Sequence, residues 1–443
     1  MMQIRLLSKL RTGLNSKPSM MQLYPLYLLL LVALPLSSPA QYRPHLLVLT
    51  DASIIDGSHP VPAMHQTVVI KDGRIVEIQP GMMAFPDSAV IINLKGKYLI
   101  PGLIDSHVHM ATDPSGTDNR PHTLQVLQEM LYSGVTTVRD MAGDGRVLAE
   151  LARDANTGEI TSPDIYYSAL MAGSPFFTDP RTQASTKGGV SGGMPYMKAI
   201  TDTTNITLAV AQAIGSGATG IKLYADLPAD LVIKILYEAK KQNIPVWAHA
   251  WLQGAKPSDI VKAGAISISH APLLIYEKIN KVPDSWKQAG PGADFWDKNV
   301  PAFDELFMLM KQHHTVLDAT LLTYKKWATT DTTMRWDYEI AKRITSRAYA
   351  SGVAICAGTD DDQDQFVQEE MRLLVADAGF SPFDAIVAAT KNSAAAVNLD
   401  ATKGSIAIGM DADLLVLTRN PLENIDNIKS VDLVIKRGRI YQR

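Results

Sequence analysis

Two histidines separated by one residue follow an apolar run near position 100. The stretch reads LIDSHVHM over 103–110, directly after YLIPG. Alternate residues of a strand point to the same face, so His107 and His109 would aim their rings into one space, with Asp105 on the same face. Such a pair suits a divalent metal, and the alternative is a polar strand end with two ordinary histidines. The pair alone leaves both interpretations open.

Four further residues of metal-binding type lie where later apolar, β-rich runs end. They are Lys222 in GATGIKLYAD, His249 in VWAHA, His270 in SISHA and Asp360 in AGTDD. Several histidines together with a carboxylate oxygen form a suitable ligand set for zinc or another divalent metal. The recurrence of these residue types at strand ends favours a metal site.

Lys222 has its own chemistry. A buried ammonium group near divalent metal is desolvated and repelled, so it tends to lose its proton. The neutral amine can react with carbon dioxide, and the resulting carbamate carries a carboxylate able to bridge two metal ions. The alternative is a salt-bridged or outward-snorkelling strand lysine, and spacing alone does not decide between them.

The elements that would position these residues alternate between strands and helices. Amphipathic stretches at 121–133, 228–242 and 335–350 predict helices. Eight strands with intervening helices predict an α/β fold, a (β/α)8 TIM barrel whose active site gathers at the strand C-terminal ends. The predicted strands are 98–107, 134–140, 164–170, 218–226, 244–250, 265–271, 315–322 and 352–360.

Short β-like runs flank the barrel region at both ends of the chain. Residues 41–98 and 400–443 together predict a small β-sandwich domain, and Lys71-Asp72-Gly73-Arg74 predicts a hairpin turn within it. The barrel would then span 99–399. Two longer connections, 172–202 and 272–300, would shape the substrate site at the barrel mouth.

The first 40 residues predict a secretory signal, with basic residues, an apolar run and small residues ending at Ala40. The apolar core lies within 20–40, and 1–19 could be an upstream start-site extension. An uncleaved anchor is the alternative. Export to the periplasm or the medium is the expectation, with no stable membrane partner after cleavage. The single cysteine, Cys356, excludes an internal disulfide.

Composition narrows the range of partners. The chain has 443 residues and a formal net charge of −3, with no block of like charges. This balance gives no electrostatic reason to expect nucleic acid as a partner. A small-molecule substrate is the expected partner, and a homo-oligomer remains open.

Taken together, these features make the chain resemble the amidohydrolase superfamily, close to its imidazolonepropionase-like and Xaa-Pro dipeptidase-like branch. The resemblance runs from about residue 45 to the C-terminus and rests on the order of several motifs. These are LIPGLIDSHVHM, GVTTVRDM, GATGIKLYAD, VWAHA, SISHA, AGTDD, EEMRLLVADAGFSPFDAIVAATKNSAAAV and GSIAIGMDADLLVLTRNPLENI. Each motif is weak alone, and together they are specific.

The resemblance implies a role for each ligand candidate. His107, His109 and Asp360 would hold one divalent metal, with zinc expected; His249 and His270 would hold a second. Carboxylated Lys222 would bridge the two ions. A hydroxide shared by the metals would attack the substrate carbonyl, and Asp360 would act as general acid and base.

Three neighbouring residues have two interpretations each. Asp105 would orient a metal-bound histidine, or accept hydrogen bonds from the backbone. Tyr224 would donate to the substrate carbonyl, or simply pack. Arg139 would bind a substrate carboxylate, or form a salt bridge with Asp140 or Asp105.

The sequence departs from the branch in two loops, and both affect the substrate. After the third strand many members carry a Gly-Gly-His loop, whereas this chain reads TKGGVSGGMPY without histidine. The segment after Asp360 reads DDQDQFVQEEM and also lacks a histidine. Asp361, Asp362 and Asp364 there would receive a cationic group, or form an ordinary solvated loop.

The sequence leaves three functions open. The first is an exported binuclear amidohydrolase that hydrolyses a dipeptide or N-acyl amino acid, with a lactone or ester hydrolase as a variant. The second is a mononuclear deaminase or cyclic-amide hydrolase, which the presence of Lys222 disfavours. The third is a non-catalytic binding protein, which the intact set of six ligand types disfavours.

Overall fold

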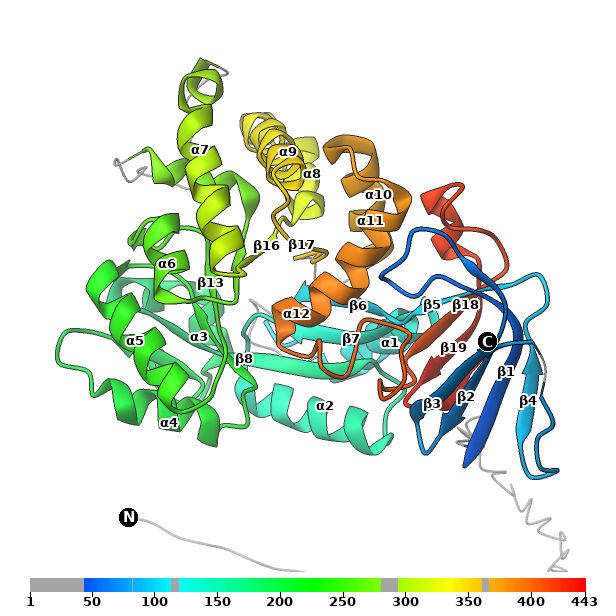
Figure 1. Ribbon diagram of the computed structural model, residues 1–443. Coiled ribbons are helices and arrows are strands. Elements are labelled where there is room, and N and C mark those ends of the chain that lie inside the picture. Colours follow the sequence, from blue (N-terminus) through cyan, green and yellow to red (C-terminus); the bar gives the residue numbers. More distant parts are fainter. Residues whose placement is uncertain (1–43, 82, 113–118, 280–293, 361–365) are drawn as a thin grey trace, which may run out of the picture. The chain divides into compact units, whose positions relative to one another are not determined.

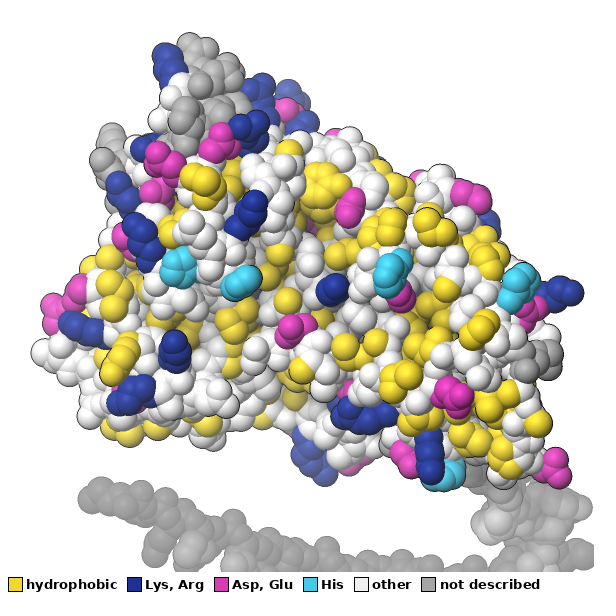
Figure 2. Space-filling model, viewed as in Figure 1, with side chains coloured by type: hydrophobic (Ala, Val, Ile, Leu, Met, Phe, Trp, Pro, Cys, Tyr) yellow, Lys and Arg dark blue, Asp and Glu magenta, His cyan; other side chains and the backbone are white. Residues whose placement is uncertain are grey.

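The computed structural model describes residues 44–81, 83–112, 119–279, 294–360 and 366–443. The predicted signal at 1–40 lies outside these ranges. Among the helices described, none combines the length and the apolar character needed to cross a membrane. On the face seen in Figure 2, basic and acidic side chains are interspersed among apolar ones.

Eight parallel strands form a barrel, and each pairs with its neighbours in chain order. Ser106 N donates to Ala357 O at 3.0 Å and Asp360 N donates to His107 O at 2.8 Å, which links the last strand back to the first. The strands are β6 (Leu103–Val108), β7 (Val135–Asp140), β8 (Asp164–Gly173), β11 (Gly220–Leu223), β13 (Val246–His249), β15 (Ser267–Ser269), β16 (Val316–Asp318) and β17 (Ile355–Cys356). The predicted fold class is confirmed.

One predicted strand is in fact two. The run at 98–107 divides into β5 (Tyr98–Pro101), which pairs with β1 and β18 of a second sheet, and β6 of the barrel. The division falls at Gly102, where a Cβ would lie 2.4 Å from the Thr136 side-chain oxygen. The chain therefore passes from one sheet to the other at a point that has no room for a side chain.

Helices connect the barrel strands and cover its outside (Figure 1). Their amphipathic faces pack on the strands, as Leu148 and Leu151 do in α2. The main helices are α1 (Arg120–Tyr132), α2 (Gly145–Thr157), α4 (Ile206–Gly215), α5 (Ala229–Lys241), α6 (Pro257–Ala263), α7 (Asp294–Gln312), α8 (Leu321–Thr330), α9 (Arg335–Ala350), α10 (Val367–Ala378), α11 (Pro382–Val387) and α12 (Ser393–Val397). Strand β8 continues past its barrel neighbours and pairs there with β10 (Met197–Ile200).

Both chain ends contribute to the second sheet (Figure 1). Its strand order is β20-β19-β18-β5-β1-β2-β3, with β4 beside β1. The predicted hairpin forms there, since Lys71 pairs with Arg74 across Asp72 and Gly73, which both have positive φ. The remaining strands are β1 (Leu46–Ile54), β2 (Ala63–Lys71), β3 (Arg74–Pro80), β4 (Val90–Asn93), β18 (Leu414–Leu417), β19 (Val431–Lys436) and β20 (Arg439–Tyr441).

A buried ion cluster joins this sheet to the foot of the barrel. Lys403 Nζ lies 3.1 Å from a carboxylate oxygen of Asp164, the first residue of β8, and also contacts Asp413. Lys436 lies 3.1 Å from Asp164, and Arg437 lies 2.7 Å from it. Although burial opposes ionisation, these cations hold the pKa of Asp164 far below its usual range.

Replacing Lys403 with methionine should therefore lower the free energy of unfolding by about 3–5 kcal/mol, because Asp164 and Asp413 would stay buried with one cation fewer. Urea denaturation measures the change. Lys234→Met is the control, since Lys234 pairs with Asp230 while both side chains are more than half exposed, and it should cost about 0–1 kcal/mol. Equal effects of the two substitutions would contradict the assigned role of the cluster.

Candidate metal centre

The C-terminal ends of the barrel strands bring the predicted ligand residues into one cluster. The ring centroids of His107 and His109 lie 5.3 Å apart, and those of His107 and His270 lie 5.2 Å apart. The ring centroid of His249 lies 4.5 Å from that of His270. The cluster comprises His107, His109, Lys222, His249, His270 and Asp360.

Three of these residues have the geometry of a metal site. Asp360 Oδ1 lies 3.3 Å from His107 Nε2 and 3.2 Å from His109 Nε2. Two ligand atoms bound to one tetrahedral zinc ion at its usual bond lengths lie about 3.3 Å apart. His109 Nδ1 donates to the Ala142 carbonyl at 3.1 Å, which leaves its Nε2 lone pair for an ion. These three residues therefore fit a divalent cation.

His249 and His270 form a second group of donors beside the first. Burial lowers the pKa of His270 to about 3 and holds the pKa of His249 well below its usual value. Metal binds the neutral imidazole, so low pKa values keep these lone pairs free of protons. His270 Nδ1 lies 3.0 Å from Thr320 Oγ1, which holds its ring in place.

Lys222 is inside the barrel and does not snorkel outward. Its side chain is 1% exposed, and its Nζ donates to Ser269 Oγ at 3.2 Å. No ion pair within 4 Å joins it to a carboxylate among the described residues. Burial lowers the pKa of Lys222 to about 7, so the reactive neutral amine is well populated near neutral pH. Carboxylation itself remains a prediction.

Asp318, the last residue of β16, also belongs to the cluster, although it is not among the ligand residues predicted from the sequence. Its Oδ2 lies 2.6 Å from His107 Nδ1 and accepts from Ser269 Oγ at 2.9 Å. A histidine whose Nδ1 is held by a carboxylate presents Nε2 to a metal. The strand predicted at 315–322 forms only over Val316–Asp318, and residues from Leu321 onward belong to helix α8. Asp318 therefore lies at the true end of the strand, whereas the longer predicted strand places it in the middle.

The backbone at three strand ends adopts positive φ angles: His270 at 76°, Thr320 at 52° and Asp360 at 48°. Non-glycine residues rarely adopt this region, and such strain concentrates at functional sites. At Gly358, a Cβ would lie 2.4 Å from Asp318 Oδ1 and 2.7 Å from His107 Cβ. Only glycine lets the chain before Asp360 pass so close to both residues.

Asp105 and Arg139 are fully buried inside the barrel. Asp105 accepts from the backbone N–H groups of His107 and Thr359, both at 3.1 Å, so its alternative interpretation describes it better than contact with an imidazole. Arg139 is fully buried and donates to Ser106 O, Ser267 Oγ and Ala396 O. Because Arg139 is buried and bonded to protein groups, the prediction that it binds a substrate carboxylate is wrong. The predicted salt bridge with Asp140 or Asp105 is wrong too, since the carboxylate nearest to its guanidinium is that of Asp318, at 3.7 Å.

Aromatic residues surround the cluster at the barrel mouth. The ring of Tyr224 lies 3.9 Å from that of His249 and stacks on Phe176 at 4.3 Å, so the residue does pack. Arg181 lies within hydrogen-bonding reach of the Tyr224 hydroxyl. Tyr324, in helix α8, is 6% exposed with its ring 6.3 Å from His270. Nothing in the sequence marks Tyr324 or Arg181, because both lie in connections rather than at strand ends.

Part of the predicted mouth lies outside the described residues. Asp361, Asp362 and Asp364 do, and so does much of the connection at 272–300. The connection at 172–202 is described and contains the short helix α3 (Pro180–Ser185). Phe176 and Arg181 belong to it, so this loop does reach the candidate site.

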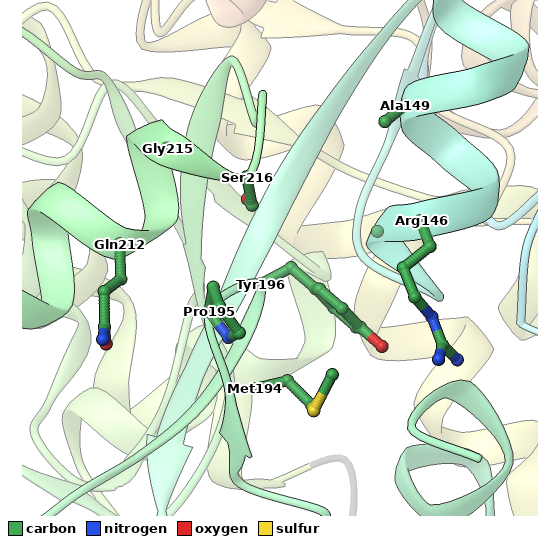
Figure 3. Close-up of a pocket in the computed structure, with 9 residues that line it drawn as sticks. Arg146, Ala149, Met194, Pro195, Tyr196, Gln212, Gly215 and Ser216 are labelled. Carbon is green, nitrogen blue, oxygen red and sulfur yellow. The ribbon is translucent and has the colours of Figure 1, made fainter. Parts of the chain in front are cut away.

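A separate hollow of about 470 Å³ lies on the outside of the barrel, with apolar atoms over most of its lining. Figure 3 shows Tyr196 and Pro195 between helices α2 and α4, with Arg146 at one side. None of the predicted site residues lines this hollow. This hollow is therefore separate from the cluster at the strand ends.

Comparison with known proteins agrees with this architecture. The chain matches the amidohydrolase family over residues 98–441. It is 27% identical over 386 residues to ochratoxinase from Aspergillus niger, covering 78% of this chain and 75% of that protein. It is 23% identical over 362 residues to adenine deaminase 1 from Latilactobacillus sakei subsp. sakei, covering 79% of this chain and 51% of the deaminase.

A solved structure of a Xaa-Pro dipeptidase with bound methionine in its active site has the same fold. It superposes with a TM-score of 0.73 at 22% identity, covering 90% of this chain and 100% of that one. The family match spans most of the chain. We conclude that the chain belongs to the amidohydrolase family and is a hydrolase acting on amide carbon–nitrogen bonds.

Proposed function

We propose that the protein is an exported binuclear metal-dependent hydrolase that cleaves a dipeptide or an N-acyl amino acid. The observation that carries this proposal is the position of Lys222. It lies buried in the same cluster as the His107–His109–Asp360 group and the His249–His270 pair, with a pKa lowered to about 7. Within the described part of the chain no ion pair explains the burial of this lysine, and a metal-bridging carbamate would explain it.

The His107–His109–Asp360 group would hold one ion and the His249–His270 pair would hold the second, with zinc as the expected metal. When bound, two divalent ions would polarise the substrate carbonyl and make water nucleophilic at neutral pH. Asp360 would take a proton from that water and return it to the leaving nitrogen. Although burial opposes ionisation, His107, His109 and His270 hold the pKa of Asp360 far below its usual range, so this carboxylate is ionised near neutral pH.

The mouth supports a substrate with an apolar side chain and a carboxylate. Phe176 and Tyr224 form one aromatic wall, and Trp251 stacks on Tyr276 at 3.5 Å to form another. Tyrosine hydroxyls at 224 and 324 would donate hydrogen bonds to substrate oxygen. Arg181, whose guanidinium already pairs with Asp179 at 2.8 Å, would be the cation that a carboxylate approaches. The methionine named in the Xaa-Pro dipeptidase structure is an amino acid of this kind.

Two alternative reactions share this scaffold. A deaminase or cyclic-amide hydrolase with one ion has support from the adenine deaminase relative, although this chain spans about half of that protein. A lactone or ester hydrolase would use the same groups on a different carbonyl. The buried Lys222 favours the two-ion amide hydrolase over both one-ion reactions.

Metal content provides the main test. The purified protein should hold about two equivalents of zinc per chain, and Lys222→Ala should lower its affinity for metal about 10–100-fold or more, because the bridging ligand is lost. Elemental analysis after dialysis against chelator measures both. Lys234→Ala removes an exposed lysine and should change nothing. One equivalent that Lys222→Ala leaves in place would favour the one-ion reactions.

Asp318→Asn should lower zinc affinity about 10–100-fold while the protein remains folded, because His107 would lose the acceptor that fixes its Nδ1. Competition with a coloured chelator gives the affinity, and thermal unfolding checks the fold. Asp154→Asn is the matched control, since Asp154 is buried and bound to Arg120 away from the cluster. Unchanged affinity in Asp318→Asn would contradict this role.

The proposed export rests on the sequence of residues 20–40. Protein recovered outside the cytoplasm should begin at Gln41, because cleavage is expected after Ala40. Mass spectrometry of the N-terminal peptide decides this. Protein that is found in the cytoplasm with its first 40 residues intact would contradict it.

A further inference from the structure

Helix α8 begins without a cap of its own. Its first helical residue is Leu321, and the preceding Thr320 has φ 52° and ψ 45°, in the left-handed region. Threonine is normally a good N-cap, because its hydroxyl accepts from the backbone N–H groups of the first turn. Here Thr320 makes no such bond. Its Oγ1 lies 3.0 Å from Nδ1 of His270 instead.

The cap comes from another helix. Glu370 of α10 accepts from Leu321 N at 2.9 Å with one carboxylate oxygen, and from Leu322 N at 2.7 Å with the other. Glu370 is fully buried and its side chain makes no ion pair among the described residues. Burying a carboxyl group costs free energy unless hydrogen bonds or an opposite charge compensate for the lost water. Its two oxygens match two otherwise unsatisfied helix donors.

We propose that Glu370 is a positioning residue that caps helix α8 from outside, which frees the Thr320 hydroxyl to fix the ring of His270. Nδ1 of His270 lies 3.0 Å from Thr320 Oγ1 and 3.9 Å from Asp360 Oδ2, and a hydrogen bond between Nδ1 and Thr320 leaves the lone pair of Nε2 for a metal. Loss of either contact lets Thr320 return to its ordinary role as an N-cap, and the ring of His270 loses its support. Glu370 thus acts on the metal site without touching it. This inference rests on the proposed function, because it treats His270 as a metal ligand.

The neighbouring residue Glu369 provides a matched control on the same helix. Its carboxylate pairs with Arg372 and lies 3.9 Å from Lys429, and it is partly exposed. Glu369→Gln makes the same change from carboxyl to amide on the same turn of α10 without altering the cap of α8. It should leave zinc affinity unchanged.

The experiment measures zinc binding, with Zn²⁺ alone as the probe, by competition with a chelator on the full chain. Thr320→Val should weaken zinc binding about 10–100-fold, and Thr320→Ser should restore affinity because it keeps the hydroxyl. Glu370→Gln offers one acceptor to two donors and should weaken zinc binding in the same direction. Glu370→Asp, which draws the carboxylate back by one methylene, tests the same contact if Glu370→Gln folds poorly.

The decisive comparison is the double variant Thr320→Val with Glu370→Gln. If both residues act through the ring of His270, the double variant should have about the same zinc affinity as whichever single variant binds zinc less tightly. The inference would be overturned if the losses of zinc affinity in the two single variants multiplied in the double variant. It would also be overturned if a Glu370 variant had a lower melting temperature but unchanged zinc affinity. Either result would leave the proposed function standing. A wild-type protein that binds no zinc would instead contradict the proposed function.

Discussion

The carboxylate of Asp318 is the contact on which the geometry of the metal centre depends. It lies inside the barrel and reaches His107 at 2.6 Å, Ser269 at 2.9 Å and Arg139 at 3.7 Å. These residues belong to β6, β15 and β7, so one side chain of β16 fixes three other strands relative to each other. A fully buried carboxylate is tolerated only where hydrogen bonds and an opposite charge stabilise it, and here all three partners do so. Gly358 leaves room for it beside His107.

The electrostatics of the cluster follow from its depth. Burial lowers the pKa of Lys222, His249 and His270, while the pKa of Asp360 and of Asp318 is held below the usual value by neighbouring histidines in spite of burial. His109 differs, because Asp360 raises the pKa of its imidazole in spite of burial. The other nitrogen donors present lone pairs beside ionised carboxylates, which suits a cation. The same desolvation that makes Lys222 costly as an ammonium group makes it reactive as an amine.

Much of the barrel is predictable from sequence because its determinants are local. Several strands are apolar runs with a polar residue at or beside their end, which is enough to place His107, His249 and His270 at one end of the barrel. Asp318 ends β16 in the same way, but the strand predicted at 315–322 runs past it. The run at 98–107 is predicted as one strand because its sequence is continuous. The chain leaves one sheet for the other at Gly102, and this point is marked only by the close approach of Gly102 to Thr136 in the structure. The prediction for Arg139 is wrong because the alternation of side chains along a strand gives the face on which a residue lies, but not how deep in the barrel its guanidinium is placed. Tyr324, Arg181 and Glu370 escape sequence analysis, since their roles come from contacts between segments far apart in the chain.

The chemistry and the selectivity of the site lie on physically different parts of the fold. The ligand candidates stand on strand ends whose backbone is fixed by the barrel and by contacts such as Asp105 with Thr359. The walls of the mouth come from connections, where substitution costs little stability. The connection after the third strand contains the stretch TKGGVSGGMPY, without histidine, and Phe176 and Arg181 of this connection reach Tyr224. Because Tyr224 lies directly on His249, a change in that loop alters what approaches the cluster and leaves the ligand geometry alone. Relatives that share the barrel can therefore differ in substrate while they keep the same strand-end residues.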